Sequence, residues 1–224
     1  MGVPWRHAHT SPARFRSIAS RRVRWDDADW EAWRPEQAAE RLREIDVPWC
    51  VAAGWSIDLF IGRERREHED LEIAIPGRSL PEFLDVLAGF EVYAVNVPGR
   101  TTFTPIMEAG EGLAETHQTW VRDPETGSWR LDLFRDPSDG DIWICRRDER
   151  IRLPYSEVIE WTDDGIPYGR PEIVLLFKAK HAHQDKDQTD FEAVLPHLGT
   201  AARGRLAEWL ELVHPGHAWI RRLT

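Results

Sequence analysis

The clearest alternation of polar and apolar positions lies in residues 70–75, where every second residue is aliphatic. A period of two is typical of a strand that is buried on one face. The pattern places Asp70 and Glu72 together on the face opposite the aliphatic side chains. Before this strand, an apolar run over residues 49–53 predicts a core strand, and residues 54–62 predict a short helix that ends at a glycine.

The rest of the pattern predicts a sheet-rich first part and a helical second part. Further period-two patterns predict strands at residues 90–95, 102–107, 116–121, 128–135, 142–145 and 151–153. Helical spacing predicts helices at residues 35–45, 80–88, 171–181, 187–198 and 201–213. We therefore expect an α+β (mixed α/β) protein. Its predicted parts are a flexible basic arm (1–30), a catalytic sheet domain (31–165) and a helical C-terminal domain (166–224).

The two acids of residues 70–75 have a spacing that suits metal binding. Carboxylates at positions i and i+2 of a strand lie roughly 7 Å apart at their Cα atoms, so their oxygens can converge on a cation. Magnesium is commonly bound by one or two carboxylates together with substrate phosphates. Asp70 and Glu72 therefore predict a magnesium site that takes a nucleotide, whereas a solvated polar strand face is the alternative that the spacing leaves open.

The segment around these acids resembles the polymerase-β-like nucleotidyltransferases, in particular the small bacterial proteins that adenylylate aminoglycosides or lincosamides. The matching residues are Gly54-Trp55, Ile57-Asp58, Gly62-Arg63, Arg66, His68 and Asp70-Leu71-Glu72. The family has a Gly-Gly-Trp or Gly-Ser turn, a short helix and an Asp-x-Asp or Asp-x-Glu strand. This chain departs from the pattern at Ala53, which replaces the first glycine, and in a slightly longer gap between turn and acids. The resemblance covers about residues 35–224.

The resemblance implies a fold, an activity and a set of site residues. It implies a nucleotidyltransferase sheet domain that faces a helical C-terminal domain, and transfer of a nucleoside monophosphate, AMP in the first instance, from a nucleoside triphosphate to a hydroxyl of a small molecule such as an aminoglycoside or lincosamide. Two Mg²⁺ ions would be held by Asp70, Glu72 and Asp132, the last matching a third acid on a later strand. A hydrogen-bonded edge aspartate is the alternative for Asp132. Nucleotide binding is assigned to six residues: Gly54, Trp55, Arg66, His68, Lys178 and Lys186.

The distribution of lysine supports a phosphate site. Lysine accounts for only three of the 29 lysine and arginine residues, and all three lie within residues 178–186. A lysine ammonium acts as a compact point charge on phosphate, although chance clustering is the alternative. Residues two apart on a helix point in different directions, so we assign Lys178 rather than Lys180 to the cleft and add Lys186 from the following loop. Asp187 is interpreted as the N-cap of the next helix.

Composition narrows the class of protein. The net charge of −10 argues against a broad nucleic-acid-binding surface and suits a cationic acceptor. Cys50 and Cys145 show no zinc or disulfide spacing, and no apolar run reaches the length of a membrane span. We expect a cytoplasmic protein. Residues 1–25 hold six arginines and no acid, a composition that fits a flexible arm or, alternatively, a transit peptide.

Two other functions remain open at the level of sequence. Ala53 and Glu72 depart from the commonest form of the motif, which would suit a nucleotide-binding or interaction module on a degenerate transferase scaffold. A toxin-like transferase that acts on tRNA or protein is the other alternative. It would need a basic groove, which only the arginine-rich arm could supply.

Overall fold

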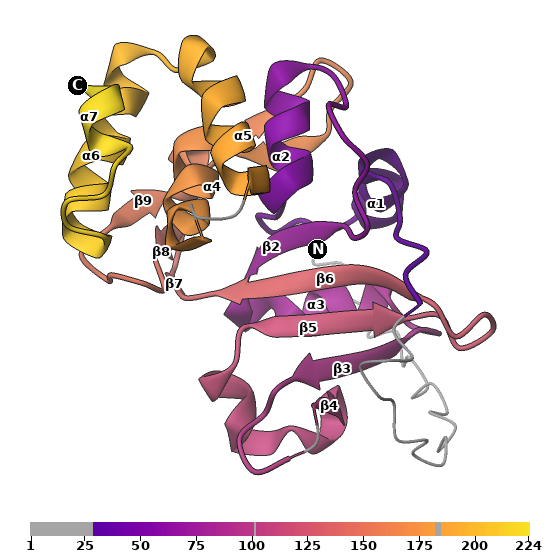
Figure 1. Cartoon of the computed structure of the whole chain (residues 1–224). Coiled ribbons are helices and arrows are strands. Elements are labelled where there is room, and N and C mark those ends of the chain that lie inside the picture. The colour runs from indigo at the N-terminus through magenta and orange to yellow at the C-terminus, as the bar shows by residue number, and fades with distance from the viewer. Residues whose placement is uncertain (1–28, 101, 182–184) are drawn as a thin grey trace, which may run out of the picture.

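The computed structural model of the chain describes residues 29–100, 102–181 and 185–224, so residues 1–28 of the predicted arm lie outside the described part. The described residues form a large mixed sheet, a small second sheet and a group of helices beside them (Figure 1).

In the described part of the chain, the large sheet has eight strands in the order β10-β11-β1-β2-β6-β5-β3-β4. β1 runs parallel to β11 and β2 runs parallel to β6, whereas the other neighbours are antiparallel. The strands are β1 (Cys50–Val51), β2 (Glu72–Pro76), β3 (Glu91–Val95), β4 (Phe103–Pro105), β5 (Gln118–Arg122), β6 (Trp129–Asp136), β10 (Ile159–Trp161) and β11 (Pro167–Gly169). The small sheet consists of β7 (Ser138–Asp139), β8 (Ile142–Ile144) and β9 (Arg152–Pro154).

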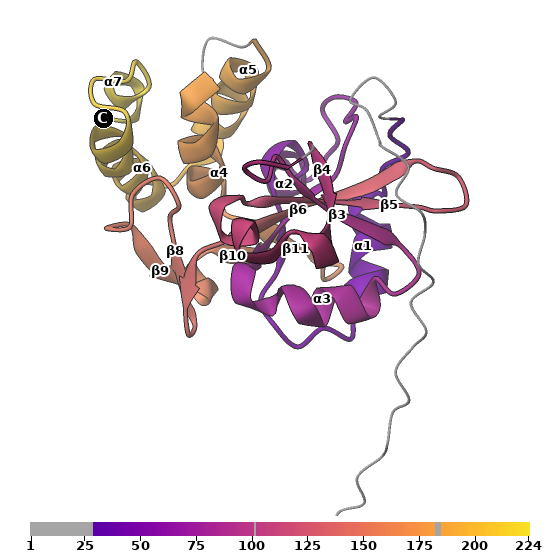
Figure 2. The ribbon, with the colours of Figure 1, turned by 90° about the horizontal axis from the view of Figure 1, so that it is seen from below.

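One face of the large sheet is covered by α1 (Pro35–Leu42) and α3 (Leu80–Val86); α3 runs along the lower edge of the molecule in Figure 2. The alternating aliphatic residues point to this side, where Ile73 and Leu133 are buried with Leu42 and Phe83. Short 3₁₀ helices connect several elements: η2 (Gly77–Ser79), η3 (Ile106–Glu108), η4 (Gly110–Glu115), η5 (Tyr155–Glu157), η6 (Ala179–His181) and η7 (Leu195–His197).

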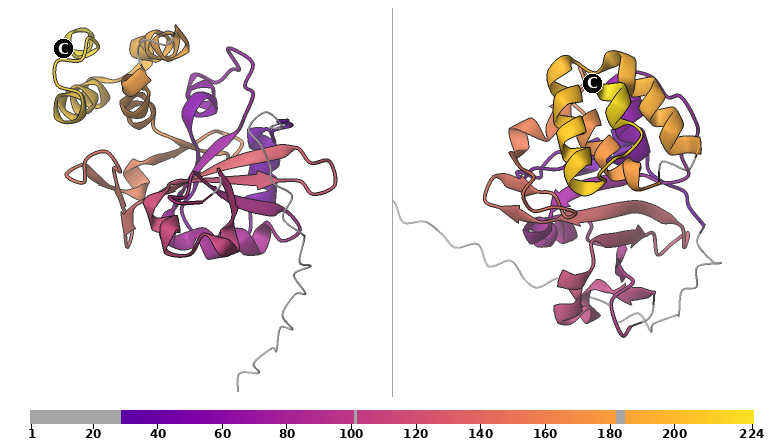
Figure 3. Two further views of the ribbon diagram at one scale, coloured as in Figure 1. Left: turned by 60° about the horizontal axis from the view of Figure 1, so that its bottom comes forward. Right: turned by 60° about the vertical axis from the view of Figure 1, so that its left-hand side comes forward.

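A second hydrophobic core joins the sheet domain to the C-terminal helices. These helices are α4 (Pro171–Lys178), α5 (Asp185–Val194), α6 (Thr200–Val213) and α7 (Ile220–Leu223). Ile57 of α2 (Ala53–Ile61) is buried in this core with Leu175, Phe191 and Leu210. The C-terminal helices gather on one side of the sheet and leave β3, β4 and β5 at the far end (Figure 3). The two parts are therefore held together by a continuous apolar contact through α2.

The helix boundaries follow from local chemistry. α2 ends at Gly62, whose left-handed φ of 78° is readily reached by glycine, and the Gly62 amide donates to the carbonyls of Asp58 and Leu59. α1 and α4 each begin at a proline, Pro35 and Pro171, as expected for the first helical position. The chain that leaves α2 then runs through residues 63–71 toward the acidic strand.

Most predicted elements are present, and three details differ. β2 begins at Glu72, so Asp70 precedes the strand rather than opening it. The large sheet continues past residue 165, because β11 pairs with β1 and β10. The interpretation of Asp187 as an N-cap is wrong, since α5 begins at Asp185. The Asp187 carboxylate instead accepts a hydrogen bond from Lys178 Nζ at 2.8 Å.

Candidate active site

The acids predicted from the sequence meet at neighbouring strands. Glu72 of β2 and Asp132 of β6 are Cα partners in the parallel β2–β6 pair. Residues in register on adjacent strands project from the same face of a sheet, so both carboxylates lie on the face opposite the aliphatic core. The Asp132 amide donates to the Leu71 carbonyl at 2.9 Å, which fixes the register just after Asp70. The structure thus brings Asp70, Glu72 and Asp132 to one place on the sheet.

Burial and mutual repulsion disfavour the charged forms of these three carboxyl groups. Burial raises the pKa of Glu72 to about 8, and the charges of Asp70 and Asp132 add to the rise. Burial also raises the pKa of Asp132 to about 7, although a hydrogen bond from Gln118 opposes the shift. Burial likewise raises the pKa of Asp70, against the pull of Lys186. A cation bound between the carboxylates would relieve this repulsion.

The carboxylate of Asp132 is buried. Asp132 is 4% exposed; its Oδ2 accepts a hydrogen bond from Gln118 Nε2 at 2.8 Å, and the Trp120 side chain also donates to this carboxylate. A buried carboxylate is costly unless hydrogen bonds or a cation stabilise its charge. Across residues 29–100, 102–181 and 185–224, no three acidic, histidine or cysteine side chains already converge as a metal-ligand set. The oxygen donors nevertheless fit a hard cation such as Mg²⁺, which binds few carboxylates and retains several waters.

A cavity of about 390 Å³ opens beside the acids, between the sheet and α4. Glu72 lines the cavity, whereas Asp70 and Asp132 are not part of the lining; Asp132 is the neighbour of Glu72 on the adjacent strand. Ala53, the first residue of α2, also lines the cavity, so the positive end of that helix is at the wall. Four basic side chains also line the cavity, together with the acids Asp136 and Asp187: Arg146, Arg147, Lys178 and Lys186. The cavity therefore combines an acidic edge with a cationic wall.

The predicted phosphate lysines are both at this cavity. Lys178, at the end of α4, and Lys186, in the first turn of α5, line it, whereas Lys180 is exposed and is not part of the lining. Lys178, and not Lys180, therefore lies at the cavity. The assignment of Lys178 and Lys186 to phosphate binding remains a prediction.

Four other residues assigned to the nucleotide lie outside the cavity lining and contact one another. Gly54 is buried beneath Arg66 and His68, and a Cβ at this position would come within 2.9 Å of the His68 ring. Trp55 stacks on the His68 ring at 4.3 Å between centroids. Position 54 therefore requires glycine because the side chains of Arg66 and His68 approach its backbone closely. A direct role of Gly54, Trp55, Arg66 and His68 toward the nucleotide stays a prediction.

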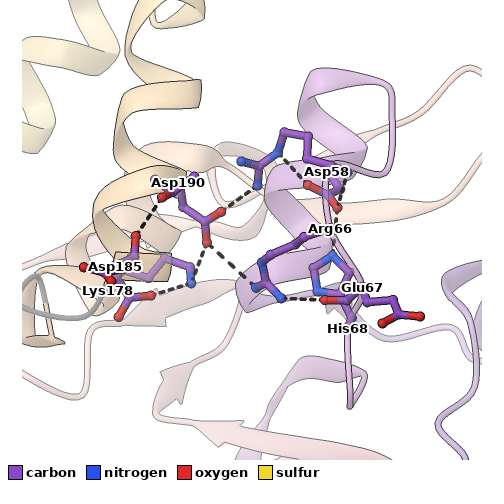
Figure 4. A network of polar contacts seen from close by, with 10 residues as sticks. Asp58, Arg66, Glu67, His68, Lys178, Asp185 and Asp190 are labelled. Carbon is purple, nitrogen blue, oxygen red and sulfur yellow. Dashed lines mark hydrogen bonds and ion pairs between the residues drawn. The ribbon is translucent and has the colours of Figure 1, made fainter.

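A buried polar network links the acid-bearing loop to the C-terminal helices (Figure 4). Asp58 of α2 lies 2.7 Å from His68 Nε2 and 2.6 Å from Arg65 Nε. Arg65 also contacts Asp190 of α5, and Asp190 contacts Lys178. Charged groups with so little exposure are retained only when they are paired. The network therefore fixes how α4 and α5 sit against the segment before Asp70.

Several cavity residues were not singled out from the sequence. Asp136 accepts hydrogen bonds from Trp143 Nε1 at 2.8 Å and from Arg146 Nη1 at 2.9 Å. The Arg146 guanidinium also lies 4.3 Å from the centroid of the Phe177 ring. Arg146 and Arg147 directly follow the strand predicted at residues 142–145 and were assigned no role from the sequence. The signal in the sequence that could have indicated them is the pair of adjacent arginines directly after a predicted strand.

The chain is similar to nucleotidyltransferases both in part of its sequence and in its fold. Residues 36–117 match the family model of aminoglycoside-2''-adenylyltransferase, and the resemblance predicted from the sequence is thereby confirmed. The 2''-aminoglycoside nucleotidyltransferases of Escherichia coli and Klebsiella pneumoniae are 26% identical to this chain over 80 residues. That alignment covers 36% of this chain and 44% of each relative, so the chain spans less than half the length of the curated relatives it matches.

Solved structures show the same fold over most of the chain. The lincosamide antibiotic adenylyltransferase LnuA, bound to lincomycin, aligns with a TM-score of 0.50 at 16% identity, covering 78% of this chain and 98% of its own. ANT(2'')-Ia in complex with adenylyl-2''-tobramycin aligns with a TM-score of 0.51 at 14% identity, covering 79% and 95%. At such identities the likeness concerns the fold. No helix in the described residues is both long and apolar enough to cross a membrane.

Proposed function

We propose that this protein is a Mg²⁺-dependent nucleotidyltransferase that moves AMP from ATP to a hydroxyl of a small antibiotic-like acceptor. The observation that carries the proposal is the register of β2 and β6, which pairs Glu72 with Asp132 beside a cavity lined by cations. The match to the adenylyltransferase family model and the shared fold support the same activity.

Asp70, Glu72 and Asp132 are the residues that would hold two magnesium ions. When bound, the ions would offset the repulsion among the three carboxylates and stabilise the attacking and leaving oxygens of the transfer. The register that pairs Glu72 with Asp132 and the raised pKa values of both carboxyl groups support this assignment.

The remaining steps are assigned to side chains of the cavity. Lys178 and Lys186 would bind the β- and γ-phosphates, with Arg146 and Arg147 as further cations on the same wall. Asp132 would help to take up the proton of the acceptor hydroxyl. The hydroxyl oxygen forms a bond to the α-phosphorus while the bond to the bridging oxygen breaks, and pyrophosphate leaves. Positioning and charge supply the catalysis.

The acceptor is proposed from the relatives and from charge. One structural neighbour is bound to lincomycin and another to adenylylated tobramycin, so a lincosamide or an aminoglycoside is the first candidate. The net charge of −10 suits a cationic acceptor.

A pyrophosphate-release screen of the four nucleoside triphosphates tests the proposal. Each is combined with Mg²⁺ and with aminoglycosides, lincosamides or bulk tRNA, and we expect release with ATP and an antibiotic. Asp70→Asn should abolish release, and wild-type rates in that variant would contradict the assignment of the acids. Release only with tRNA would indicate the toxin-like alternative. Nucleotide binding without release against any acceptor would support the degenerate-scaffold alternative.

A further inference from the structure

The carboxylate of Asp190 is fully buried among three basic side chains. Its Oδ1 lies 2.6 Å from Arg65 Nη2, and its Oδ2 lies 2.8 Å from Lys178 Nζ and 4.0 Å from Arg66 Nη2. Asp190 is 0% exposed. One carboxylate on α5 therefore contacts both the lysine at the end of α4 and the arginines of the loop that leads to Asp70 (Figure 4).

The ammonium of Lys178 is restrained by two carboxylates. Lys178 Nζ donates a hydrogen bond to Asp187 Oδ1 at 2.8 Å and forms an ion pair with Asp190 Oδ2 at 2.8 Å, while its side chain also lines the cavity. Lysine has a long flexible side chain whose charge is otherwise free to move. Two carboxylates on α5 thus restrict where the ammonium lies at the cavity wall.

The same carboxylate is connected to the acidic site. Arg65 bridges Asp190 and Asp58, and Asp58 in turn contacts His68, which is two residues before Asp70. Around Asp190, three carboxylates lie opposite three side chains of Arg and Lys: Asp58, Asp187, Asp190, Arg65, Arg66 and Lys178. Loss of the Asp190 charge would leave this buried cluster with an excess positive charge.

We propose that Asp190 is a positioning residue for Lys178, holding its ammonium at the cavity wall in fixed relation to the acid-bearing loop. The proposal rests on the proposed function insofar as the group that Lys178 meets is the triphosphate of the nucleotide. Asp190 acts through Lys178 and does not itself touch the nucleotide.

Binding of Mg²⁺–ATP, measured by isothermal titration calorimetry, tests the proposal. We expect Asp190→Asn to weaken binding about tenfold, which corresponds to roughly 1.4 kcal/mol. Lys178→Ala should weaken binding at least as much. If Asp190 acts only through Lys178, the double variant should bind no more weakly than Lys178→Ala alone, because the two changes remove one interaction. If the fold-losses in affinity of the two single variants multiply in the double variant, the proposal is overturned. Unchanged affinity in folded Asp190→Asn would also overturn it.

Two further variants separate positioning from stability. Glu172→Gln removes another buried carboxylate that pairs with an arginine, Arg205, away from the cavity lysines. It should lower the melting temperature and leave ATP affinity unchanged; an equal loss of affinity would overturn the proposal. If Asp190→Asn does not fold, Asp187→Asn removes the second restraint on Lys178, and its effect should also vanish in the Lys178→Ala background.

The binding measurements can be interpreted whether or not the protein catalyses nucleotide transfer. A wild-type protein that binds Mg²⁺–ATP but releases no pyrophosphate would contradict the proposed function, and the binding cycle would still measure the role of Asp190. A wild-type protein that binds none of the four nucleoside triphosphates would overturn the positioning proposal as well.

Discussion

At the scale of single residues, Ala53 is the most unusual position of the candidate site. It opens α2 at the cavity wall with φ of 48°, in the left-handed region that residues with a Cβ rarely adopt. The family motif has glycine here, and the structure shows why: the chain turns from β1 into α2 through a conformation that glycine reaches without cost. The alanine therefore keeps the turn and adds strain.

We predict that Ala53→Gly stabilises the protein by about 0.5–1 kcal/mol. An L-residue in the left-handed region costs about 1–2 kcal/mol, and the larger unfolded-state entropy of glycine offsets about 0.4–1 kcal/mol of the relief. Urea unfolding measures the difference. The matched control is Gly62→Ala, where φ is 78° and an added Cβ meets no atom within 4 Å, so only the backbone cost of about 1 kcal/mol should appear, with opposite sign. A loss of stability in Ala53→Gly would show that the turn is not strained.

At the scale of elements, the parallel pairing of β2 with β6 creates the acidic site. Alternation within each strand predicts that Glu72 and Asp132 avoid the aliphatic core, and this was visible in the sequence. The alternation did not show which strands become neighbours, because 60 positions separate these two residues and pairing over that distance leaves no local pattern; only the family resemblance implied that the two strands are adjacent. β11 shows the same limit, since it inserts between β10 and β1 from residues assigned to the helical C-terminal domain.

Some residues of the cavity lining could be recognised from the sequence, and others could not. The lysine cluster could be recognised because lysine is rare in this chain. Arg146 could not be distinguished among 26 arginines, because its position depends on the hydrogen bond to Asp136 and on the Phe177 ring. The contacts of Asp190 similarly need α4, α5 and the loop before Asp70 to be placed in three dimensions.

We predict that Asp132→Asn makes the magnesium-free protein more stable and removes its response to Mg²⁺. The substitution deletes one of three mutually repelling carboxylates in a buried place, where the charged form is disfavoured. Melting curves with and without Mg²⁺ measure both effects, and pyrophosphate release should fall about 10²–10³-fold. A wild-type melting temperature that does not rise with Mg²⁺, or a variant that responds as strongly as the wild type, would contradict the metal assignment.

At the scale of the whole molecule, the sheet and the C-terminal helices are joined through α2. Ile57 of α2 is 0% exposed in the core formed mainly by α4, α5 and α6. Ser56, the preceding residue, donates from its hydroxyl to the Gly169 carbonyl of β11 at 2.6 Å. Because α2 also begins at the cavity wall, one element transmits the packing of the helices to the candidate site.

We predict that the sheet and the helices unfold as one cooperative unit, and that Ile57→Ala lowers the stability of both by the same amount. Removing a buried isoleucine side chain costs about 2–5 kcal/mol, and the loss should shift a single guanidinium transition seen equally by far-UV circular dichroism and tryptophan fluorescence. Hydrogen exchange should show amides of α4 and β6 with equally increased opening. The control is Leu212→Ala on α6, where the side chain is 41% exposed and the change should be small. If the variant instead shows two separated transitions, the helices are an independent folding unit, and α2 does not couple them to the acids.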